Sequence, residues 1–240
     1  GNNLDDKIYL DLPVISSPMD TVTESAMVTA IYNQGGIGII HRYNSIEEQT
    51  VSVQAAAVRE TRNIGAAIGV TGDFLERASA VHAAGANVLC VDVAHGHHIL
   101  MKEALFALRK FFSDDLHIMA GNVATQQAFD DLSDWGANSI RCNIGGGSIC
   151  STRIQTGHGL PGLQTIIDCS KSTRKAKIIA DGGIRTSGDI VKAFAAGADF
   201  VMLGSLLAGT NESPGEEIQT PTGLVKKYRG MASKEAQMDW

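Results

Sequence analysis

Short apolar runs recur along this sequence with longer amphipathic stretches between them, and that alternation restricts the chain to folds built on a parallel sheet. Each run is short enough to form one buried strand, and the stretches between the runs have the spacing of helices that cover a sheet. Because βαβ units place successive strands in parallel, we expect an α/β fold. The eight runs span residues 13–19, 36–41, 63–69, 88–94, 118–123, 139–144, 177–180 and 200–203.

A weak internal repeat predicts how these strands are arranged. A small-residue turn precedes every second run, as GGIGII from Gly35, GANVL from Gly85, GANSI from Gly136 and GADFV from Gly197. A glycine there suits a left-handed helix C-cap directly before a strand. Four such units make eight strands, and the 240 residues match the roughly 250 of a (β/α)8 TIM barrel. An open doubly wound sheet has similar local patterns, but the fourfold repeat favours a closed, single-domain barrel over residues 1–240.

Helix start signals follow the first two strands. Thr21 with Glu24, and Ser45 with Glu48, have the spacing of capping boxes, in which each side chain binds the other residue's main-chain N–H group. The segment after the eighth run differs, because residues 211–240 are polar and rich in turn residues. We therefore expect helices after the first two strands and no helix in the place that would complete the eighth unit.

Charge and composition exclude several classes of protein. The formal net charge of −6 and the short Lys/Arg clusters without aromatic residues argue against binding to nucleic acid. No apolar run reaches the roughly 18 residues of a membrane helix. The four cysteines show no CxxC spacing, and the first residues do not resemble a secretory signal. We expect a cytoplasmic protein that binds neither nucleic acid nor a membrane.

The segment 143–159, NIGGGSICSTRIQTGHG, follows the sixth strand and carries the strongest chemical signal. In a TIM barrel the loops after the strands hold the active site. Three consecutive glycines leave main-chain N–H groups free to face an anion, and Cys150 lies beside hydroxyl side chains. We predict that Cys150 is a nucleophile. The other cysteines fall in predicted strands or a helix, where a free cysteine behaves as a small apolar residue.

Paired glycine turns follow the seventh and eighth strands, at Asp181-Gly182-Gly183 and at Gly204-Ser205. In barrels these loops commonly bind phosphate through main-chain N–H groups, so we expect a phosphorylated ligand. Asp181 would repel a phosphate. Its carboxylate has two other roles that the spacing does not separate, which are accepting hydrogen bonds from ribose hydroxyls and capping the next helix.

Histidines cluster after the fourth strand in the sequence HGHH, at His95, His97 and His98. Alternate residues of an extended segment project to one side, which is compatible with a metal site. No set of acidic or histidine residues at other strand ends completes a ligand shell, so hydrogen-bonded or solvated histidines are favoured over a metal-dependent hydrolase. Asp92, shortly before them, is a better candidate for a ribose-binding group, with a structural role as the alternative.

Seven motifs occur in order along the chain, which are SSPMDTVTE (16–24), GGIGIIH, AGNVAT, GGGSICSTR, ADGGIRTSGD, VMLGSLLAGTNESPGE and YRGM (228–231). Together they make the chain resemble the family of inosine 5′-monophosphate (IMP) dehydrogenase and guanosine 5′-monophosphate (GMP) reductase. The resemblance covers nearly the whole chain, and this family has a (β/α)8 barrel. SPMDTVTE, DGGIR, GSLLAG and YRGM are similar to the dehydrogenase branch, which is therefore favoured over the reductase.

The resemblance implies NAD-dependent oxidation of IMP to xanthosine 5′-monophosphate (XMP). Cys150 would attack C2 of the purine, hydride would leave to NAD, and the covalent thioimidate would be hydrolysed with Thr152 positioning the water. In the reductase alternative, NADPH would convert GMP to IMP with loss of ammonia. The positions that match the family's phosphate, ribose and purine sites are Ser17, Met19, Asn122, Ser148, Asp181, Gly183, Gly204, Ser205, Tyr228, Gly230 and Met231.

By the same resemblance, a cofactor site and an ion site adjoin the catalytic loop. Asp92 matches the residue that holds the nicotinamide ribose, and Arg141 and Gly145 lie near the cofactor. The main-chain carbonyls of Gly145, Gly147 and Cys150 match a potassium site. The family also suggests a homotetramer.

The sequence departs from the family pattern in three ways. The regulatory CBS pair that usually follows the second helix is absent, and Asn143 and Gly146 replace the residues usual in the catalytic loop. The chain ends at Trp240, before the family's mobile flap and last helix. We therefore expect a truncated barrel, and a barrel that binds a purine nucleotide without turnover is a third alternative.

Overall fold

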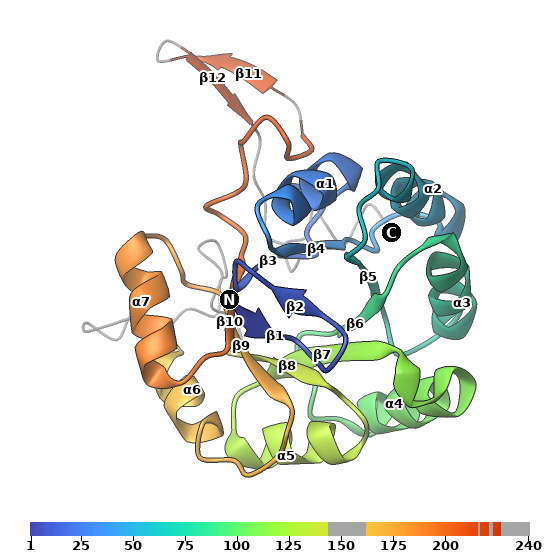
Figure 1. Ribbon diagram of the computed structural model, residues 1–240, viewed down its shortest axis with the longest axis vertical. Helices are drawn as coiled ribbons and strands as arrows, with labels where there is room; N and C mark the ends of the chain where they lie inside the picture. The colour runs from blue at the N-terminus through green and yellow to red at the C-terminus, as the bar shows by residue number, and fades with distance from the viewer. Residues whose placement is uncertain (144–161, 216, 221–222, 227–240) are drawn as a thin grey trace.

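The computed structural model describes residues 1–143, 162–215, 217–220 and 223–226, with side chains described up to residue 215. Eight parallel strands close into a barrel, which confirms the predicted TIM fold (Figure 1). Each predicted apolar run coincides with one barrel strand, although two strands extend one residue beyond their runs, at His117 and at Asp181. Pairing of the last strand with the first closes the ring. The strands are β3 (Val14–Ser16), β4 (Ile37–Ile40), β5 (Ile64–Ile68), β6 (Val88–Asp92), β7 (His117–Val123), β8 (Ser139–Cys142), β9 (Lys177–Asp181) and β10 (Phe200–Leu203).

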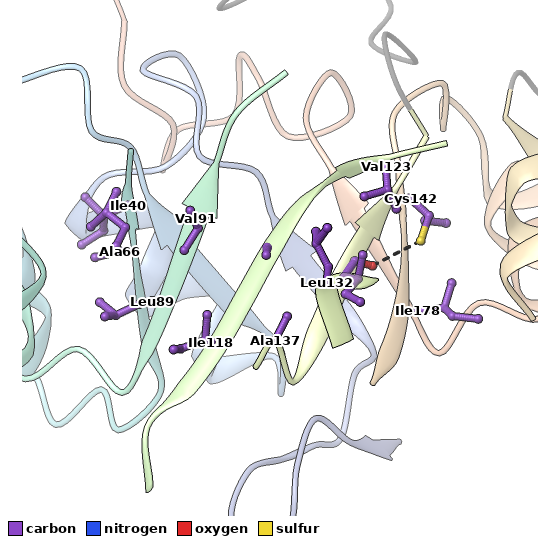
Figure 2. Close-up of a cluster of buried hydrophobic side chains, with 14 of the residues drawn as sticks. Ile40, Ala66, Leu89, Val91, Ile118, Val123, Leu132, Ala137, Cys142 and Ile178 are labelled. Atoms are coloured by element: carbon purple, nitrogen blue, oxygen red, sulfur yellow. Dashed lines mark hydrogen bonds between the residues drawn. The ribbon is translucent and has the colours of Figure 1, made fainter. Parts of the chain in front are cut away.

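Helices form the outer layer of the barrel (Figure 1). Apolar side chains on the outer faces of the strands pack against them, and Figure 2 shows part of this layer, including Ile40, Leu89 and Leu132. The helices of the described residues are α1 (Ser25–Asn33), α2 (Ile46–Ala57), α3 (Phe74–Ala84), α4 (Ile99–Phe112), α5 (Gln126–Asp134), α6 (Leu163–Cys169) and α7 (Ser187–Ala196), with a 3-10 turn η1 (Ser113–Asp115) after α4.

The four repeat glycines have the backbone conformation predicted for them. Gly35, Gly85, Gly136 and Gly197 have φ angles of 99°, 129°, 118° and 117°, and each lies at or just after the end of a helix. Side chains disfavour this region of φ, so glycine allows each helix to turn directly into the next strand.

The helix start predicted at Ser45 is confirmed in part. The Ser45 hydroxyl accepts a hydrogen bond from the Glu48 N–H at 3.0 Å, and α2 begins at the next residue. The return contact differs from a capping box, because the Glu48 carboxylate accepts from the Ser45 hydroxyl rather than from its N–H.

The capping box predicted at Thr21 is wrong. Helix α1 begins at Ser25, and its N-cap, Glu24, makes no side-chain capping bond. Thr21 lies instead in a turn in which the N–H groups of the next two residues bind the Met19 carbonyl. The Glu24 carboxylate is engaged elsewhere, 2.9 Å from Nε2 of His41 at the end of β4. A tertiary contact thus replaces the local one that the spacing suggested.

An N-terminal hairpin closes the amino end of the barrel. Its strands β1 (Asn2–Asn3) and β2 (Tyr9–Leu10) pair antiparallel and lie across the centre of the ring in Figure 1. Leu4, Ile8 and Leu10 join the apolar side chains that fill the barrel interior. The hairpin therefore completes the inner core at the amino end of the barrel.

The hairpin is also fastened by hydrogen bonds. One carboxylate oxygen of Asp5 lies 2.8 Å from Nδ1 of His117, and Nε2 of His117 lies 2.8 Å from the Ser139 hydroxyl. His117 and Ser139 are the first residues of β7 and β8. With Nδ1 protonated, the neutral ring donates to Asp5 and accepts from Ser139, so every member of this chain has a partner.

Two connections bear on the sequence analysis. Residues 58–63 alone join α2 to β5, so no further domain is inserted there. After β10 the described residues form turns and then an antiparallel hairpin, β11 (Glu217–Thr220) with β12 (Gly223–Lys226), and they contain no α-helix. Within the described part of the chain, no helix has the length and apolar character needed to span a membrane.

Candidate active site at the carboxyl ends of the strands

Three charged residues that the sequence singles out meet at the carboxyl end of the barrel. Asp92 and Asp181 are the last residues of β6 and β9, and Arg141 lies in β8, one residue before its end. Arg141 Nη1 donates to Asp92 at 2.5 Å, and Nε and Nη2 donate to one oxygen of Asp181 at 3.1 and 2.8 Å. One guanidinium therefore joins the two predicted ribose-binding carboxylates.

This cluster is largely shielded from solvent. The side chains of Arg141, Asp92 and Asp181 are 8%, 16% and 14% exposed. Burial disfavours the charged guanidinium, but the Asp181 and Asp92 carboxylates outweigh that effect and hold the pKa of Arg141 well above its ordinary value. The site thus has a permanent cation shared by two carboxylates that are fixed in place.

A glycine makes the contact between Arg141 and Asp92 sterically open. In the register of the sheet, Gly121 of β7 lies between them, opposite Asp92 on one side and Arg141 on the other. A Cβ atom on Gly121 would lie 2.6 Å from the Cβ of Arg141, closer than side chains approach. Because Gly121 has no side chain, the Arg141 guanidinium can extend across β7 to Asp92 in β6.

Asn122 extends the cluster to a third contact. Its side-chain amide donates to Asp181 at 2.6 Å and to the main-chain carbonyl of Asn143 at 2.9 Å. The capping alternative for Asp181 is wrong, because Thr186 caps helix α7 in a full capping box with Asp189. Asp181 is instead held by Asn122 and Arg141 with its carboxylate at the carboxyl end of the barrel.

The glycine turns predicted to bind phosphate lie on the neighbouring part of the rim. Gly183 follows β9, and Gly204 with Ser205 follows β10, which pairs with β9. Gly183 has a φ of 72°, so a side chain there would be strained. Ser17, just after β3, donates to the Leu203 carbonyl from its N–H at 3.0 Å and from its hydroxyl at 3.1 Å. The structure thus brings these predicted residues together.

The remaining predicted site residues fall into two groups. Met19 is described, and its N–H donates to the Ser17 carbonyl at 2.8 Å, which keeps it next to the glycine-turn part of the rim. The others lie outside the described residues, and they are Gly145, Gly147, Ser148, Cys150, Thr152, Tyr228, Gly230 and Met231.

A cavity of about 300 Å³ opens next to the charged cluster, between the ends of β4, β5 and β6. Arg42, Arg77 and the acidic Asp73 contribute to its wall, together with Phe74, the segment 69–71 and Val93. Arg42 Nη2 donates to the Asp92 carbonyl at 3.1 Å, while Arg42 Nε is buried without a hydrogen-bond partner among the described residues. The charged side chains at this wall are suited to a polar ligand, with Arg42 and Arg77 positive and Asp73 negative.

Sequence reasoning gave no role to Arg42, although it noted that this residue directly follows a strand, and it did not single out Tyr43 or Arg77. The Arg42 guanidinium lies 5.4 Å from the centre of the Tyr43 ring, and burial and the nearby Asp92 raise the pKa of Tyr43. Arg77 is held by Gln49 and the Asn44 carbonyl, each at 2.9 Å. The position of Arg42 directly after a strand was a usable signal, whereas Arg77 reaches the cavity from inside a helix.

The histidine run is engaged in local contacts. His97 Nε2 lies 2.7 Å from Asp131, and the ring of His97 stacks on Trp135. His98 is the N-cap of α4, where its Nδ1 accepts from the Leu100 N–H. Across the part of the chain that the structure covers, no group of three histidine, cysteine or acidic side chains could hold a metal ion. These contacts agree with the hydrogen-bonded interpretation of HGHH.

The cysteines of the described residues are buried and free, as expected for apolar positions. Cys90 lies inside the barrel, 3.7 Å from Arg141 Nη1, and burial raises the pKa of its thiol to about 12. At that pKa the thiol is protonated at neutral pH, so Cys90 is a poor nucleophile.

Comparison with known proteins agrees with this geometry. Residues 2–239 match the sequence profile of the IMP dehydrogenase / GMP reductase domain. The chain is 37% identical to inosine-5′-monophosphate dehydrogenase of Borreliella burgdorferi, over 95% of this chain and 69% of that protein. A crystal structure of inosine 5′-monophosphate dehydrogenase from Legionella pneumophila superposes with a TM-score of 0.84 at 49% identity, covering 96% of this chain and 70% of that one.

Relatives from both branches are similar to this chain in sequence. Inosine-5′-monophosphate dehydrogenase of Halalkalibacterium halodurans is 51% identical over 71% of this chain and 35% of its own length. GMP reductase of Leishmania major is 49% identical over 70% of this chain and 35% of its own length. The match over nearly the full sequence and the shared barrel lead to one conclusion: the chain belongs to the IMP dehydrogenase/GMP reductase family.

Proposed function

We propose that this chain is an oxidoreductase that oxidises IMP to XMP with NAD as the hydride acceptor. The observation that carries the proposal is the buried cluster in which Arg141 joins Asp92 to Asp181, because it sets two ribose-binding carboxylates side by side at one rim. A reaction between two nucleotides needs their reacting rings close together, and adjacent ribose anchors supply that arrangement.

The substrate would lie between Asp181 and the glycine turns. Its ribose hydroxyls would donate to the Asp181 carboxylate, which Asn122 and Arg141 keep in place. Its phosphate would meet the main-chain N–H groups after β9 and β10, at Gly183, Gly204 and Ser205. Ser17 and Met19 would border the purine. Outside the described residues, Ser148, Tyr228, Gly230 and Met231 are proposed to complete the substrate site.

The residues around Asp92 fit a dinucleotide. The Asp92 carboxylate would accept hydrogen bonds from the nicotinamide ribose, and the cavity of about 300 Å³ beside it has room for further parts of the cofactor. Arg42, with its unsatisfied Nε, offers a cation to a phosphate group there. NAD supplies the oxidising chemistry, since it accepts a hydride. Arg141 and Gly145 are the other residues proposed to lie near it.

Cys150 is proposed to be the nucleophile. Its thiolate would bond to C2 of the purine, and hydride departure from C2 would leave a covalent thioimidate on the sulfur. Water positioned by Thr152 would then add to C2, and cleavage of the carbon–sulfur bond would release XMP and the thiolate. Because carbonyl groups are suitable ligands for a hard cation, the main chains of Gly145, Gly147 and Cys150 are proposed to bind potassium. These residues lie outside the described part of the chain.

GMP reduction is the second candidate function, favoured by the similarity to the Leishmania enzymes that bear that name. Absorbance at the nicotinamide band separates the two when enzyme is mixed with IMP and NAD or with GMP and NADPH. Signal growth in the first mixture alone supports the dehydrogenase, and signal loss in the second alone supports the reductase. Tight IMP binding without either change would indicate a barrel that binds nucleotide without turnover.

We also propose how the protein assembles and where in the cell it is located. The family suggests a homotetramer in the cytoplasm, and light scattering with the purified chain would measure its mass in solution.

A further inference from the structure

A chain of side-chain contacts runs from the start of helix α1 to the end of strand β6. The Glu24 carboxylate lies 2.9 Å from Nε2 of His41, and the His41 ring stacks on the Tyr43 ring. The Arg42 guanidinium lies over the Tyr43 ring and donates to the Asp92 carbonyl at 3.1 Å. We propose that Glu24 is a positioning residue for a dinucleotide, because this chain of contacts holds Arg42 at the cavity beside Asp92. The inference rests on the proposed function, in which Asp92 binds the nicotinamide ribose.

Hydrogen bonds fix one tautomer of the His41 ring. Its Nδ1 accepts from the Tyr43 main-chain N–H at 3.1 Å. Since a main-chain N–H group can only donate, Nδ1 carries no proton, and Nε2 carries the proton that is donated to Glu24. Both ring nitrogens are therefore engaged, and the His41 side chain is only 4% exposed. The Glu24 carboxylate thus orients the ring that accepts from the Tyr43 main chain.

The Tyr43 ring connects His41 to Arg42. The centroids of the His41 and Tyr43 rings are 6.4 Å apart, and their planes differ by 28°. The Arg42 guanidinium lies 5.4 Å from the centroid of the Tyr43 ring, within the range of a cation–π contact. When His41 turns, the ring on which the guanidinium rests loses its neighbour. The orientation of Arg42 therefore depends on the contact between Glu24 and His41.

Arg42 lies between strand β6 and the cavity wall. Its Nη2 donates to the Asp92 carbonyl, and its Nη1 lies near Gly69, because a Cβ atom on that glycine would be 3.5 Å away. Arg42 and Arg77 give the wall two cations against the carboxylate of Asp73. A guanidinium in this place binds the diphosphate that follows the nicotinamide ribose in a dinucleotide.

The segment on the substrate side is held by other bonds. The His41 N–H donates to the Thr23 carbonyl at 3.4 Å, and the Thr23 hydroxyl donates to the Ser17 carbonyl at 2.7 Å. These bonds do not involve the Glu24 carboxylate, so residues 17–23 keep their place when that carboxylate is removed. We therefore expect a loss of Glu24 to weaken the binding of the dinucleotide and to leave the binding of the purine nucleotide unchanged.

The exposure of Glu24 separates positioning from a role in folding. Its side chain is 48% exposed, and as the N-cap of α1 it makes no side-chain capping bond. Exposed ionic contacts contribute little to folding stability. The main chain of the loop is held from the other side, where buried Gln49 donates to the His41 carbonyl at 3.1 Å and buried Arg77 to the Asn44 carbonyl at 2.9 Å. Removing the Glu24 carboxylate therefore frees side chains and leaves the loop in place.

Titration of a dinucleotide into the folded chain tests the proposal. NAD and NADPH are titrated separately by isothermal calorimetry without a purine nucleotide, so no turnover occurs, and IMP is titrated alone. Glu24→Ala removes the charged acceptor of the His41 proton, and we expect the dissociation constant of the dinucleotide to rise about fivefold. Glu24→Gln keeps an acceptor oxygen and should stay within about twofold of the natural chain. The dissociation constant of IMP should not change in either variant.

Further variants assign the effect to Arg42. Arg42→Ala should weaken dinucleotide binding about tenfold. Because Glu24 acts through Arg42, the double variant Glu24→Ala/Arg42→Ala should bind the dinucleotide as Arg42→Ala does. Glu48→Ala is the matched control, since the exposed Glu48 carboxylate accepts from the Ser45 hydroxyl at the start of α2. It should bind the dinucleotide like the natural chain, and its urea midpoint should equal that of Glu24→Ala.

Any of five results would overturn the proposal. They are no binding of either dinucleotide to the natural chain, an unchanged dissociation constant in Glu24→Ala, additive losses in the double variant, an equal loss of affinity for IMP, and a urea midpoint of Glu24→Ala well below that of Glu48→Ala. Failure of the proposed function is a different result. Oxidation of IMP would then be absent, while the dinucleotide titrations still decide whether Glu24 positions Arg42.

Discussion

At the amino end of the barrel, the hairpin covers the opening with Leu4, Ile8 and Leu10, and the polar groups beneath it form one short chain from Asp5 through His117 to Ser139. At the carboxyl end, the described residues include a charged cluster, in which Arg141 pairs with Asp92 and Asp181. The same eight strands thus have an amino end covered by the apolar side chains of the hairpin, called the floor below, and a charged rim beside a cavity at the carboxyl end.

This difference shows where the barrel accepts an energetic cost. Charges are expensive to bury unless they are paired, and Arg141 is paired twice. Apolar residues at either end of the barrel would avoid the free-energy cost of burying charged groups. The placement of the costly cluster at the carboxyl end, next to glycine turns, is what a ligand site requires and a packing role does not.

The largest effect is expected from removing the shared cation. Arg141→Met leaves two carboxylates buried without their partner, so we expect the free energy of unfolding to fall by about 3–5 kcal/mol. Urea unfolding, monitored by circular dichroism, measures this free energy. Arg141→Lys is the matched control, since it keeps the charge and should lose less. Equal losses in both variants would show that the geometry of the guanidinium, and not its charge, matters.

Filling the space at Gly121 should have a smaller effect at the same end. In Gly121→Ala the added methyl group overlaps the Cβ of Arg141, so we expect a loss of about 1–3 kcal/mol in stability. Gly72→Ala is a useful comparison, because nothing lies within 4 Å of a Cβ there, although its φ of 61° is itself strained. An unchanged urea midpoint in Gly121→Ala would contradict the proposed reach of Arg141 across β7.

At the amino end, we expect the free energy of unfolding to decrease as the pH falls. Burial lowers the pKa of His117 below 6.5 although Asp5 opposes it, so the unfolded chain takes up a proton that the folded chain does not. Burial raises the pKa of Asp5, but its hydrogen bonds from His117 and two main-chain N–H groups outweigh this and leave it below 3.8. Above pH 6.5 both residues contribute fully to the free energy of unfolding. The His117 contribution is lost as the pH falls from 6.5 through the pKa of the folded state. The Asp5 contribution is lost as the pH falls below 3.8.

His117→Leu isolates that contribution. It removes both hydrogen bonds of the ring, so we expect a loss of about 1–2 kcal/mol at pH 7 and a weaker decline of stability between pH 7 and pH 5. Urea midpoints at the two pH values give the comparison, and hydrogen exchange of residues 2–10 locates it. A pH dependence identical to that of the natural chain would show that His117 is not its source.

The smallest effect is expected from the exposed ion pair of the floor. Lys7 lies 3.0 Å from Asp115, with side chains 63% and 86% exposed. Solvent screens such pairs, so Lys7→Ala should change stability by less than about 0.5 kcal/mol. A shift in the urea midpoint as large as that of His117→Leu would mean that the hairpin depends on surface charge rather than on the buried bonds.

The floor and the rim also differ in how far the sequence predicts them. The barrel follows from local patterns, since apolar runs became strands and the repeat glycines took the positive φ that their place before a strand suggested. The hairpin gave no such signal: its two strands have two residues each, and its value lies in contacts with residues more than a hundred positions away, such as Asp5 with His117.

At the rim, the sequence identified the carboxylates but not their partners. Asp92, Asn122 and Asp181 stood out because they lie near the carboxyl ends of strands, yet spacing left Asp181 between two roles until its contacts decided against the cap. Thr21 shows the reverse failure. Its spacing with Glu24 predicted a capping box, but α1 begins only at Ser25 and the Glu24 carboxylate contacts His41 after another strand, which no local pattern records.

The most direct test of the proposed chemistry is a covalent one. The protein is incubated with IMP and NAD, quenched in acid, digested with trypsin and measured by mass spectrometry, with Cys150→Ala as the control. The account predicts a purine nucleotide attached to the peptide of residues 142–153 at Cys150, formed only when NAD is present. NADH formation without any adduct on that peptide, or an unchanged rate in Cys150→Ala, would contradict it.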